Sequence, residues 1–189
     1  MTTASPKTRP LGRPIRFCSL CGAEVRAETP AGDNRLRYVC NSCTSVHYEN
    51  PRLVVGCVAV YDGRILMCKR AIAPRLGYWT LPAGFMELGE SLAQAAARET
   101  LEEACADVTI GPLLASVNIL NAGQVHVFFR ATLPEPVFAT GEESLDVRLV
   151  APADIPWDEL AFTTNRIALE QYLWQERTGR RFVWTGNAL

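Results

Sequence analysis

The hydrophobic positions of the chain concentrate after Pro51, where their spacing predicts a series of strands. A continuous apolar run at residues 53–61 is typical of a strand buried on both faces, and the Asp62-Gly63 pair after it predicts a tight turn into a second strand at 64–70. We expect these two strands to form an antiparallel hairpin that opens the main domain. Similar patterns predict further strands at residues 113–120, 124–133 and 145–150.

Two other segments have helical spacing. Ser91 and Gln94 have the separation of a capping box, which predicts a helix from about residue 91 to 105. A second helix is predicted at residues 164–177, where apolar side chains recur at helical intervals. Strands and helices mixed in this way predict an α/β (α+β) fold.

The region before Pro51 has a different composition. Residues 1–15 are basic and rich in proline and predict a flexible tail, for which an organelle-targeting segment is the alternative. Residues 16–50 contain four cysteines but few aliphatic residues, so this segment needs a staple in order to fold. We therefore expect a tail at 1–15, a small module at 16–50 and a main domain at 51–189.

The cysteines of the small module form two CxxC pairs. Cys18 and Cys21 are separated from Cys40 and Cys43 by 18 residues, a spacing that predicts a structural zinc site with four thiolate ligands. A pair of redox dithiols is the alternative. His47 is not expected to bind the zinc, because four thiolates complete its coordination. The other three cysteines are predicted to be buried thiols, namely Cys57, Cys68 and Cys105.

Composition narrows the choice of partners. The chain has 19 Lys and Arg against 20 Asp and Glu, and this balance gives no electrostatic reason to expect nucleic acid as the main partner. No apolar run approaches the roughly 18 to 20 residues that cross a bilayer, and no apolar signal core follows the N-terminus. We expect a cytoplasmic protein with a small-molecule substrate and no membrane partner.

Three glutamates form a distinctive polar pattern in the first predicted helix. Glu99, Glu102 and Glu103 stand at i, i+3 and i+4 and therefore project from one face. The ordinary alternative is a solvated acidic face. The opposite side of the helix carries small or apolar residues, Ala93, Ala97, Leu101 and Ala104. This pattern predicts a helix packed between layers, with its glutamates in a partly enclosed cleft.

Carboxylates clustered in a cleft need a hard cation to remain ionised together. Mg²⁺ or Mn²⁺ takes oxygen ligands of this kind and keeps positions free for phosphate and water. Arg98, four residues before Glu102, is placed to orient a carboxylate or to meet a phosphate charge. The helix therefore predicts a metal-and-phosphate site.

At these residues the chain resembles the Nudix hydrolases, which share a long signature of fixed spacing. The matching positions are Gly84, Glu90, Arg98-Glu99 and Glu102-Glu103, separated by five, seven and two residues. The chain departs from the usual signature at Cys105, where glycine is usual, and at Thr100, where an aliphatic residue is usual. Both departures concern helix termination and packing and leave the acids in place.

The resemblance implies an α/β/α sandwich with a mixed sheet, preceded by a zinc ribbon. In Nudix hydrolases the three glutamates of the helix bind Mg²⁺ or Mn²⁺, and the residue at Gly84 offers a backbone carbonyl to the metal. The residue at Arg98 orients the glutamates, and the one at Glu90 supports them. The implied reaction is attack by water on a phosphorus atom of a nucleoside diphosphate derivative.

Short sequence segments outside the signature resemble plant chloroplast Nudix hydrolases that act on FAD and ADP-ribose, and their bacterial relatives. These segments are residues 50–51, 54–57, 68–70, 79–84, 143–145 and 160–162. They imply cleavage of FAD to FMN and AMP, of ADP-ribose, or of both. A zinc ribbon before the signature also resembles NADH pyrophosphatases and NAD-cap RNA decapping enzymes, but the segment typical of that branch is missing between residues 107 and 133.

Four further residues are candidates for the site. Glu143 matches a loop acid that serves some Nudix branches as general base or metal ligand, and a surface acid in a turn is its alternative. Arg70 and Tyr78 are candidates for contacts with phosphate and with flavin or adenine. Trp79 is a candidate for stacking on a base, with core packing as the alternative. A non-catalytic nucleotide-sensing regulator and a homodimer remain open.

Overall fold

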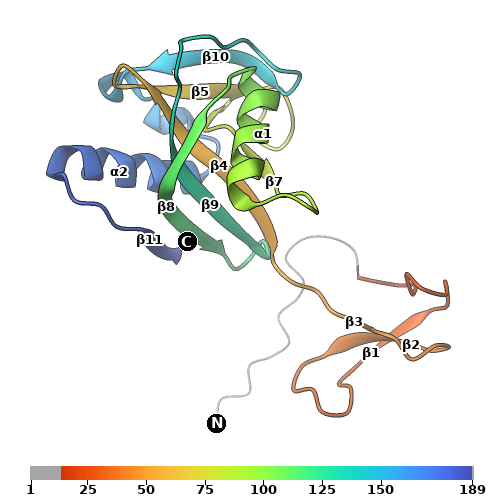
Figure 1. The fold of residues 1–189 in the computed structure, drawn as a ribbon. Coiled ribbons are helices and arrows are strands. Elements are labelled where there is room, and N and C mark those ends of the chain that lie inside the picture. The colour runs from red at the N-terminus through yellow and green to blue at the C-terminus, as the bar shows by residue number, and fades with distance from the viewer. Residues whose placement is uncertain (1–13, 189) are drawn as a thin grey trace. The chain divides into compact units, whose positions relative to one another are not determined.

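The computed structural model describes residues 14–188 of the chain (Figure 1). It divides into two compact units at Pro51–Arg52. The predicted tail falls almost entirely on residues 1–13, which lie outside the described residues. Within residues 14–188, no helix is long and apolar enough to span a membrane.

The N-terminal unit is built on a small antiparallel sheet. Its strands are β1 (Val25–Glu28), β2 (Arg37–Cys40) and β3 (Val46–His47), with β2 in the middle. The buried apolar residues of its described part are Cys18, Val39 and Cys40. A core of this size cannot hold the unit together by hydrophobic burial alone.

The larger unit contains one mixed sheet of eight strands. Its strands are β4 (Arg52–Tyr61), β5 (Arg64–Arg70), β6 (Trp79–Thr80), β7 (Ala83–Phe85), β8 (Thr109–Ile119), β9 (Gln124–Thr132), β10 (Ser144–Val150) and β11 (Trp184–Asn187). The main path runs β10-β5-β4-β9-β8-β11, while β6 pairs with β5 and β7 with β4. The pairs β4–β9 and β8–β11 are parallel and the others antiparallel, which confirms the mixed sheet.

Two helices cover opposite faces of this sheet (Figure 1). Cys57 of β4 belongs to the same hydrophobic cluster as Ala95 of α1 (Leu92–Ala104), whereas its neighbour Val58 clusters with Leu169 of α2 (Thr163–Thr178). Successive residues of a strand point to opposite faces, so both sides of β4 are buried under a helix. The short helices η1 (Pro152–Asp154) and η2 (Trp157–Glu159) precede α2. This arrangement confirms the predicted α/β/α sandwich.

Most predicted elements are present. They differ from the prediction where pairing between strands, and not the local hydrophobic pattern, sets the structure. The hairpin of β4 and β5 exists, but the two strands pair only at Val60–Ile65 and Tyr61–Arg64, while β4 pairs with β9 over its whole length up to Val60. Strand β8 begins four residues before its predicted start at residue 113. Strand β11 was not predicted because it is short and half exposed, and it exists only through its parallel pairing with β8.

Two expectations about burial are wrong. Cys57 and Cys68 are buried as predicted, but Cys105 is exposed, because the left-handed C-cap of α1 turns its side chain away from the core that Ala104 and Ala106 enter. On α1, Ala93 and Leu101 are exposed, so the helix is not packed on both sides. It has a single buried face, and Glu99 and Glu103 are among the residues of that face.

Candidate active site

Helix α1 is capped at both ends. Ser91 accepts a hydrogen bond from the Gln94 N–H at 3.3 Å, and Gln94 Oε1 accepts one from the Ser91 N–H at 2.8 Å, which confirms the capping box. At the other end Cys105 has the left-handed φ of 47°, and its N–H donates to Leu101 O. Glycine is usual at such a position, so the departure at Cys105 concerns helix termination, as predicted.

Thr100, the other departure from the signature, is fully buried on α1. Its hydroxyl donates to Ala96 O at 2.7 Å and lies 3.2 Å from Cys57 Sγ. Because both contacts are polar, the hydroxyl is satisfied where an aliphatic side chain is usual. This departure therefore changes packing and leaves the acids untouched.

Arg98 connects most of the acidic residues of the site. Its Nε and Nη2 donate to the two carboxylate oxygens of Glu90 at 3.0 and 2.7 Å. Its Nη1 donates to Glu99 Oε1 at 2.8 Å and to Glu102 Oε2 at 3.0 Å, and Nη2 also donates to Phe85 O. Only the planar fork of a guanidinium can serve so many acceptors at once. The prediction that Arg98 can orient a carboxylate thus has a geometric basis.

Glu90 is the firmly ionised member of this network. The Arg98 guanidinium and the Glu87 N–H, 2.7 Å from Glu90 Oε1, lower the pKa of Glu90 to about 2. A permanently charged Glu90 anchors Arg98 and leaves the remaining donors of the arginine for the helix glutamates.

Gly84 lies directly against Glu99. A Cβ atom placed on Gly84 would be 2.2 Å from Glu99 Oε2, well inside van der Waals contact. Gly84 belongs to β7 and pairs with Val55 of β4, so its backbone cannot easily retreat. Glycine at this position therefore lets the Glu99 carboxylate and the β7 backbone share one small space.

Glu99 and Glu103 are both withdrawn from solvent. They are 8% and 6% exposed. Burial raises the pKa of Glu99, and it raises the pKa of Glu103 to about 8, although the Ala83 N–H, 3.3 Å from Glu103 Oε2, favours the charged form. Buried carboxylates of this kind regain their charge when a cation binds beside them. The donor set, hard oxygens next to a glycine backbone, fits Mg²⁺ or Mn²⁺.

Within the described residues, the carboxylate oxygens of the three glutamates do not form one compact group. Within residues 14–188, only the four cysteines bring three or more ligand atoms within 4.8 Å of one another. Arg98 holds Glu99 and Glu102, and the Ala83 N–H holds Glu103. Binding of one ion by all three glutamates therefore requires a change of side-chain rotamer, and Glu102, whose side chain is 57% exposed, is the freest to turn.

Two of the four further candidates lie close enough to the carboxylates for their charges to act on them. Arg70 stands at the end of β5, with its guanidinium 5.2 Å from the Phe162 ring centre, and its charge favours ionised Glu103. Glu143 is close enough that its charge adds to burial in raising the pKa of Glu99 and Glu103. The structure thus brings an arginine and a further acid to the predicted site.

The two aromatic candidates differ in accessibility. Tyr78 is 37% exposed and lies under the Arg75 guanidinium at 5.3 Å. Trp79 is 7% exposed and belongs to the hydrophobic cluster under α2. Core packing is therefore a role that Trp79 has in this structure, and its contact with a base remains a prediction, as does that of Tyr78.

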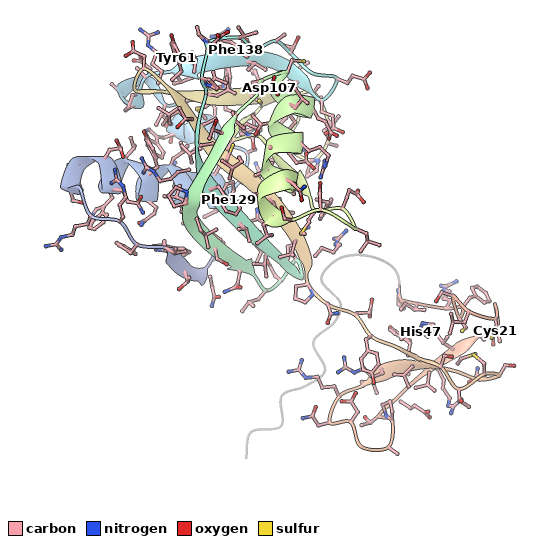
Figure 2. The ribbon with its side chains drawn as sticks, viewed as in Figure 1. Cys21, His47, Tyr61, Asp107, Phe129 and Phe138 are labelled. Atoms are coloured by element: carbon pink, nitrogen blue, oxygen red, sulfur yellow. The ribbon has the colours of Figure 1, made fainter. Side chains whose placement is uncertain are left out.

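The four cysteines of the N-terminal unit form a compact group, and Cys21 is labelled in Figure 2. Cys18 Sγ lies 3.7 Å from Cys43 Sγ, and Cys21 Sγ lies 3.4 Å from Cys40 Sγ and 3.5 Å from Cys43 Sγ. Tetrahedral zinc with bonds of about 2.3 Å needs sulfur separations near 3.8 Å, so these thiols fit the ion.

Hydrogen-bond donors lie next to several of the thiols. N–H groups of Leu20 and Ser42 point at Cys18 Sγ and Cys40 Sγ at 3.4 Å. A hydrogen bond with the Ser45 hydroxyl lowers the pKa of Cys43 to about 6. His47, also labelled in Figure 2, lies on β3 and is not part of the group, in agreement with its exclusion as a ligand.

Fold and site together define a class of protein, an α/β/α sandwich with an acidic helix that accompanies a four-cysteine module. Residues 50–172 match the model of the NUDIX domain family, and residues 16–49 match the zinc-ribbon model described as Nudix N-terminal. The chain belongs to the NUDIX domain family.

Similar proteins agree with this assignment. A NUDIX hydrolase from Nitrosomonas europaea has a TM-score of 0.87 and 45% identity, and the match covers 92% of this chain and all of that one. An ADP-ribose pyrophosphatase from Streptococcus suis shares the fold, with a TM-score of 0.60 and 21% identity over 72% of this chain and 100% of that one.

Among curated proteins, the NAD-capped RNA hydrolase NudC of Vibrio atlanticus is 35% identical over 98 residues. The match covers 50% of this chain and 34% of that protein. The chain thus spans about a third of the length of the curated relatives that it matches.

Proposed function

We propose that this protein hydrolyses the pyrophosphate bond of a dinucleotide in a reaction that depends on Mg²⁺ or Mn²⁺. The observation that carries the proposal is the acidic network of α1, in which Arg98 holds Glu99 and Glu102 next to the buried Glu103. The residues that would hold the metal are Gly84, through its carbonyl, and the three glutamates. The metal supplies charge that polarises the phosphoryl oxygens and activates water.

The residues of the chain have separate tasks in this reaction. Arg98, anchored by Glu90, holds Glu99 and Glu102 close to each other. Arg70 adds a positive charge next to Glu103 and can meet a phosphate oxygen. Glu143, which lies beside the same carboxylates, is the residue that we assign to accept a proton from water or to bind a further metal.

For the substrate, we propose a dinucleotide with an ADP half, namely FAD, ADP-ribose or both. The support is the resemblance of the short segments outside the Nudix signature, between residues 50 and 162, to hydrolases of these compounds. FAD, ADP-ribose and the NAD type of dinucleotide share adenosine and the pyrophosphate, so one acidic site can serve them all. The other half of the molecule then decides the preference.

The second candidate substrate is NADH or an NAD-capped RNA. It is favoured by the 35% identity to an NAD-capped RNA hydrolase from Vibrio atlanticus. The formal charge of −1 gives no general attraction for the RNA body, so in this case the cap would have to provide most of the recognition.

For the N-terminal unit we propose a structural zinc ion bound by Cys18, Cys21, Cys40 and Cys43. Four thiolates close the coordination sphere and leave no position for water or substrate. The ion therefore stabilises the unit and takes no part in the hydrolysis.

A substrate panel tests the activity. The full chain is assayed with Mg²⁺ on FAD, ADP-ribose, NADH, diadenosine polyphosphates and NAD-capped RNA, and the substrates are ranked by kcat/KM. We expect FAD or ADP-ribose first, with FMN and AMP as products from FAD. A higher rank for NADH or capped RNA would overturn the substrate assignment but not the assignment of pyrophosphatase activity.

Glu102→Gln tests the catalytic site without disturbing the core. We expect kcat to fall by at least about 100-fold, because a metal ligand loses its charge. Glu170→Gln is the matched control, since the Glu170 side chain is 58% exposed on α2 and that of Glu102 is 57% exposed on α1. Unchanged hydrolysis in Glu102→Gln would show the assignment to be wrong, and binding without hydrolysis by the wild type would indicate a nucleotide-sensing regulator.

A further inference from the structure

The loop at residues 139–144 closes onto the C-terminal end of α1. The Ala139 N–H donates to Ala104 O at 2.9 Å, and the Gly141 N–H donates to Glu103 O at 3.1 Å. The last carbonyl groups of a helix have no partner inside the helix. The loop supplies two of the missing donors and is thereby joined to the turn that carries Glu102 and Glu103.

Gly141 approaches this turn more closely than any other residue type could. A Cβ atom on Gly141 would lie 1.8 Å from Glu102 O and 2.9 Å from its carbonyl carbon. Gly141 is not among the residues of the described chain with a positive φ, so the need for glycine is steric and not conformational. Since the Glu102 carbonyl is fixed by the helix, any side chain at residue 141 must push the loop away.

Glu143 lies two residues further along the same loop, between two anchors. Its carbonyl accepts the Ala71 N–H at 2.8 Å at the end of β5, and the Ser144 N–H donates back to Gly141 O at 3.1 Å. The loop is therefore fixed to α1 on one side of Glu143 and to β5 on the other. These are the two elements that carry the glutamates and Arg70.

We propose that Gly141 is a positioning residue, whose lack of a side chain lets the loop dock on α1 and hold Glu143 beside Glu99 and Glu103. The inference rests on the proposed function, because it assigns Glu143 to the same metal and pyrophosphate site. Gly141 touches no reacting atom and acts only through Glu143.

A double-mutant cycle tests this dependence. The variants are Gly141→Ala, Glu143→Ala and the combination, and the readouts are kcat and KM on the best substrate of the panel. We expect Gly141→Ala to lower kcat by about tenfold or more, with KM changed by less than about twofold. In the Glu143→Ala background the same change should lower kcat by less than about twofold. An equal loss in both backgrounds, or no loss with Glu143 present, would overturn the proposal.

Mn²⁺ binding gives a readout that does not need turnover. A carboxylate near the cation favours its binding whether or not it is a ligand, so Gly141→Ala and Glu143→Ala should each raise the Kd for Mn²⁺ by about threefold or more, and the combination no further. If no substrate is cleaved but this pattern holds, the proposed function fails and the positioning role stands. If the effects of Gly141→Ala and Glu143→Ala on the Kd are additive, the positioning role is wrong.

Two further variants distinguish the positioning role from a general loss of stability. Gly111→Ala is the matched control, because its Cβ would meet a backbone oxygen, Arg130 O, at 3.2 Å away from the acidic site, and we expect kcat and Mn²⁺ affinity to stay at wild-type values. Should Gly141→Ala not fold, Ala139→Pro removes the donor to Ala104 O at an exposed residue. Ala139→Pro should lower the affinity for Mn²⁺ in the wild type but not in the Glu143→Ala background. An equal loss of affinity in both backgrounds contradicts the proposal.

Discussion

His126 should make the larger unit less stable in mildly acidic solution. The imidazole lies on β9, is 8% exposed, and places Nδ1 at 3.0 Å from Thr164 Oγ1 and Nε2 at 3.0 Å from Gln124 Oε1. Because an amide oxygen only accepts, Nε2 carries the proton, and Nδ1 accepts from the Thr164 hydroxyl. Burial lowers the pKa of His126 from 6.5 to about 4, so the ring stays neutral in the folded protein.

The sign of the effect follows from proton linkage. Between the two pKa values the unfolded chain binds a proton that the folded chain does not, so stability is lost as the pH falls below 6.5 towards about 4. For these values the loss is about 2 kcal/mol at about pH 5, relative to about pH 7.5, and about 3 kcal/mol when complete. Glu103, whose pKa is raised to about 8, acts in the opposite sense, since its contribution is lost as the pH rises.

Urea unfolding followed by tryptophan fluorescence measures this effect in the larger unit, because all four tryptophans of the chain lie after Pro51. His126→Gln provides the comparison, since glutamine does not titrate and Glu103 is present in both proteins. We expect the free energy of unfolding of the wild type to fall by about 2 kcal/mol more than that of the variant between about pH 7.5 and pH 5. If the free energy of unfolding has the same pH dependence in the two proteins, the conclusion that His126 is buried and neutral is wrong.

Three other changes test the remaining parts of the structure. Arg98→Lys should lower kcat/KM by about tenfold or more, because an ammonium cannot keep the bidentate pair with Glu90 and still reach Glu99; activity within about twofold of the wild type would contradict this. Gly84→Ala should weaken Mn²⁺ binding, measured by titration, because its Cβ overlaps the Glu99 carboxylate, and an unchanged Kd would count against the site. Cys43→Ser should reduce the bound zinc, measured by atomic absorption, and unfold the N-terminal unit in NMR spectra without moving the fluorescence transition of the larger unit; full zinc content would disprove the ligand set.

Local patterns were sufficient for much of this protein. The capping box of Ser91 and Gln94, the turn at Asp62-Gly63 and the spacing of the CxxC pairs each depend on residues that are close together in the chain, and each has the predicted structure. Short-range geometry of this kind is set by backbone sterics and local hydrogen bonds, which the residue types alone specify.

Other features depend on contacts between distant segments. The exposure of Leu101 and Cys105 and the existence of β11 follow from which surfaces a neighbouring element happens to cover. The close approach of Gly141 to Glu102 O belongs to the same group. A glycine in a turn usually indicates a need for positive φ, and in this loop the need is space against a helix that ends almost 40 residues earlier.

The sequence by itself therefore determined the kinds of element, the grouping of the four thiols and the acids that share one side of α1, because helical and CxxC spacing fix which side chains share a face. Only the tertiary structure decided how those acids are held. Glu90 anchors Arg98, Glu99 lies against Gly84, and the loop before β10 brings Glu143 to the end of α1. The physical reason is that burial and charge depend on neighbours in space, and pairing across the sheet chooses those neighbours.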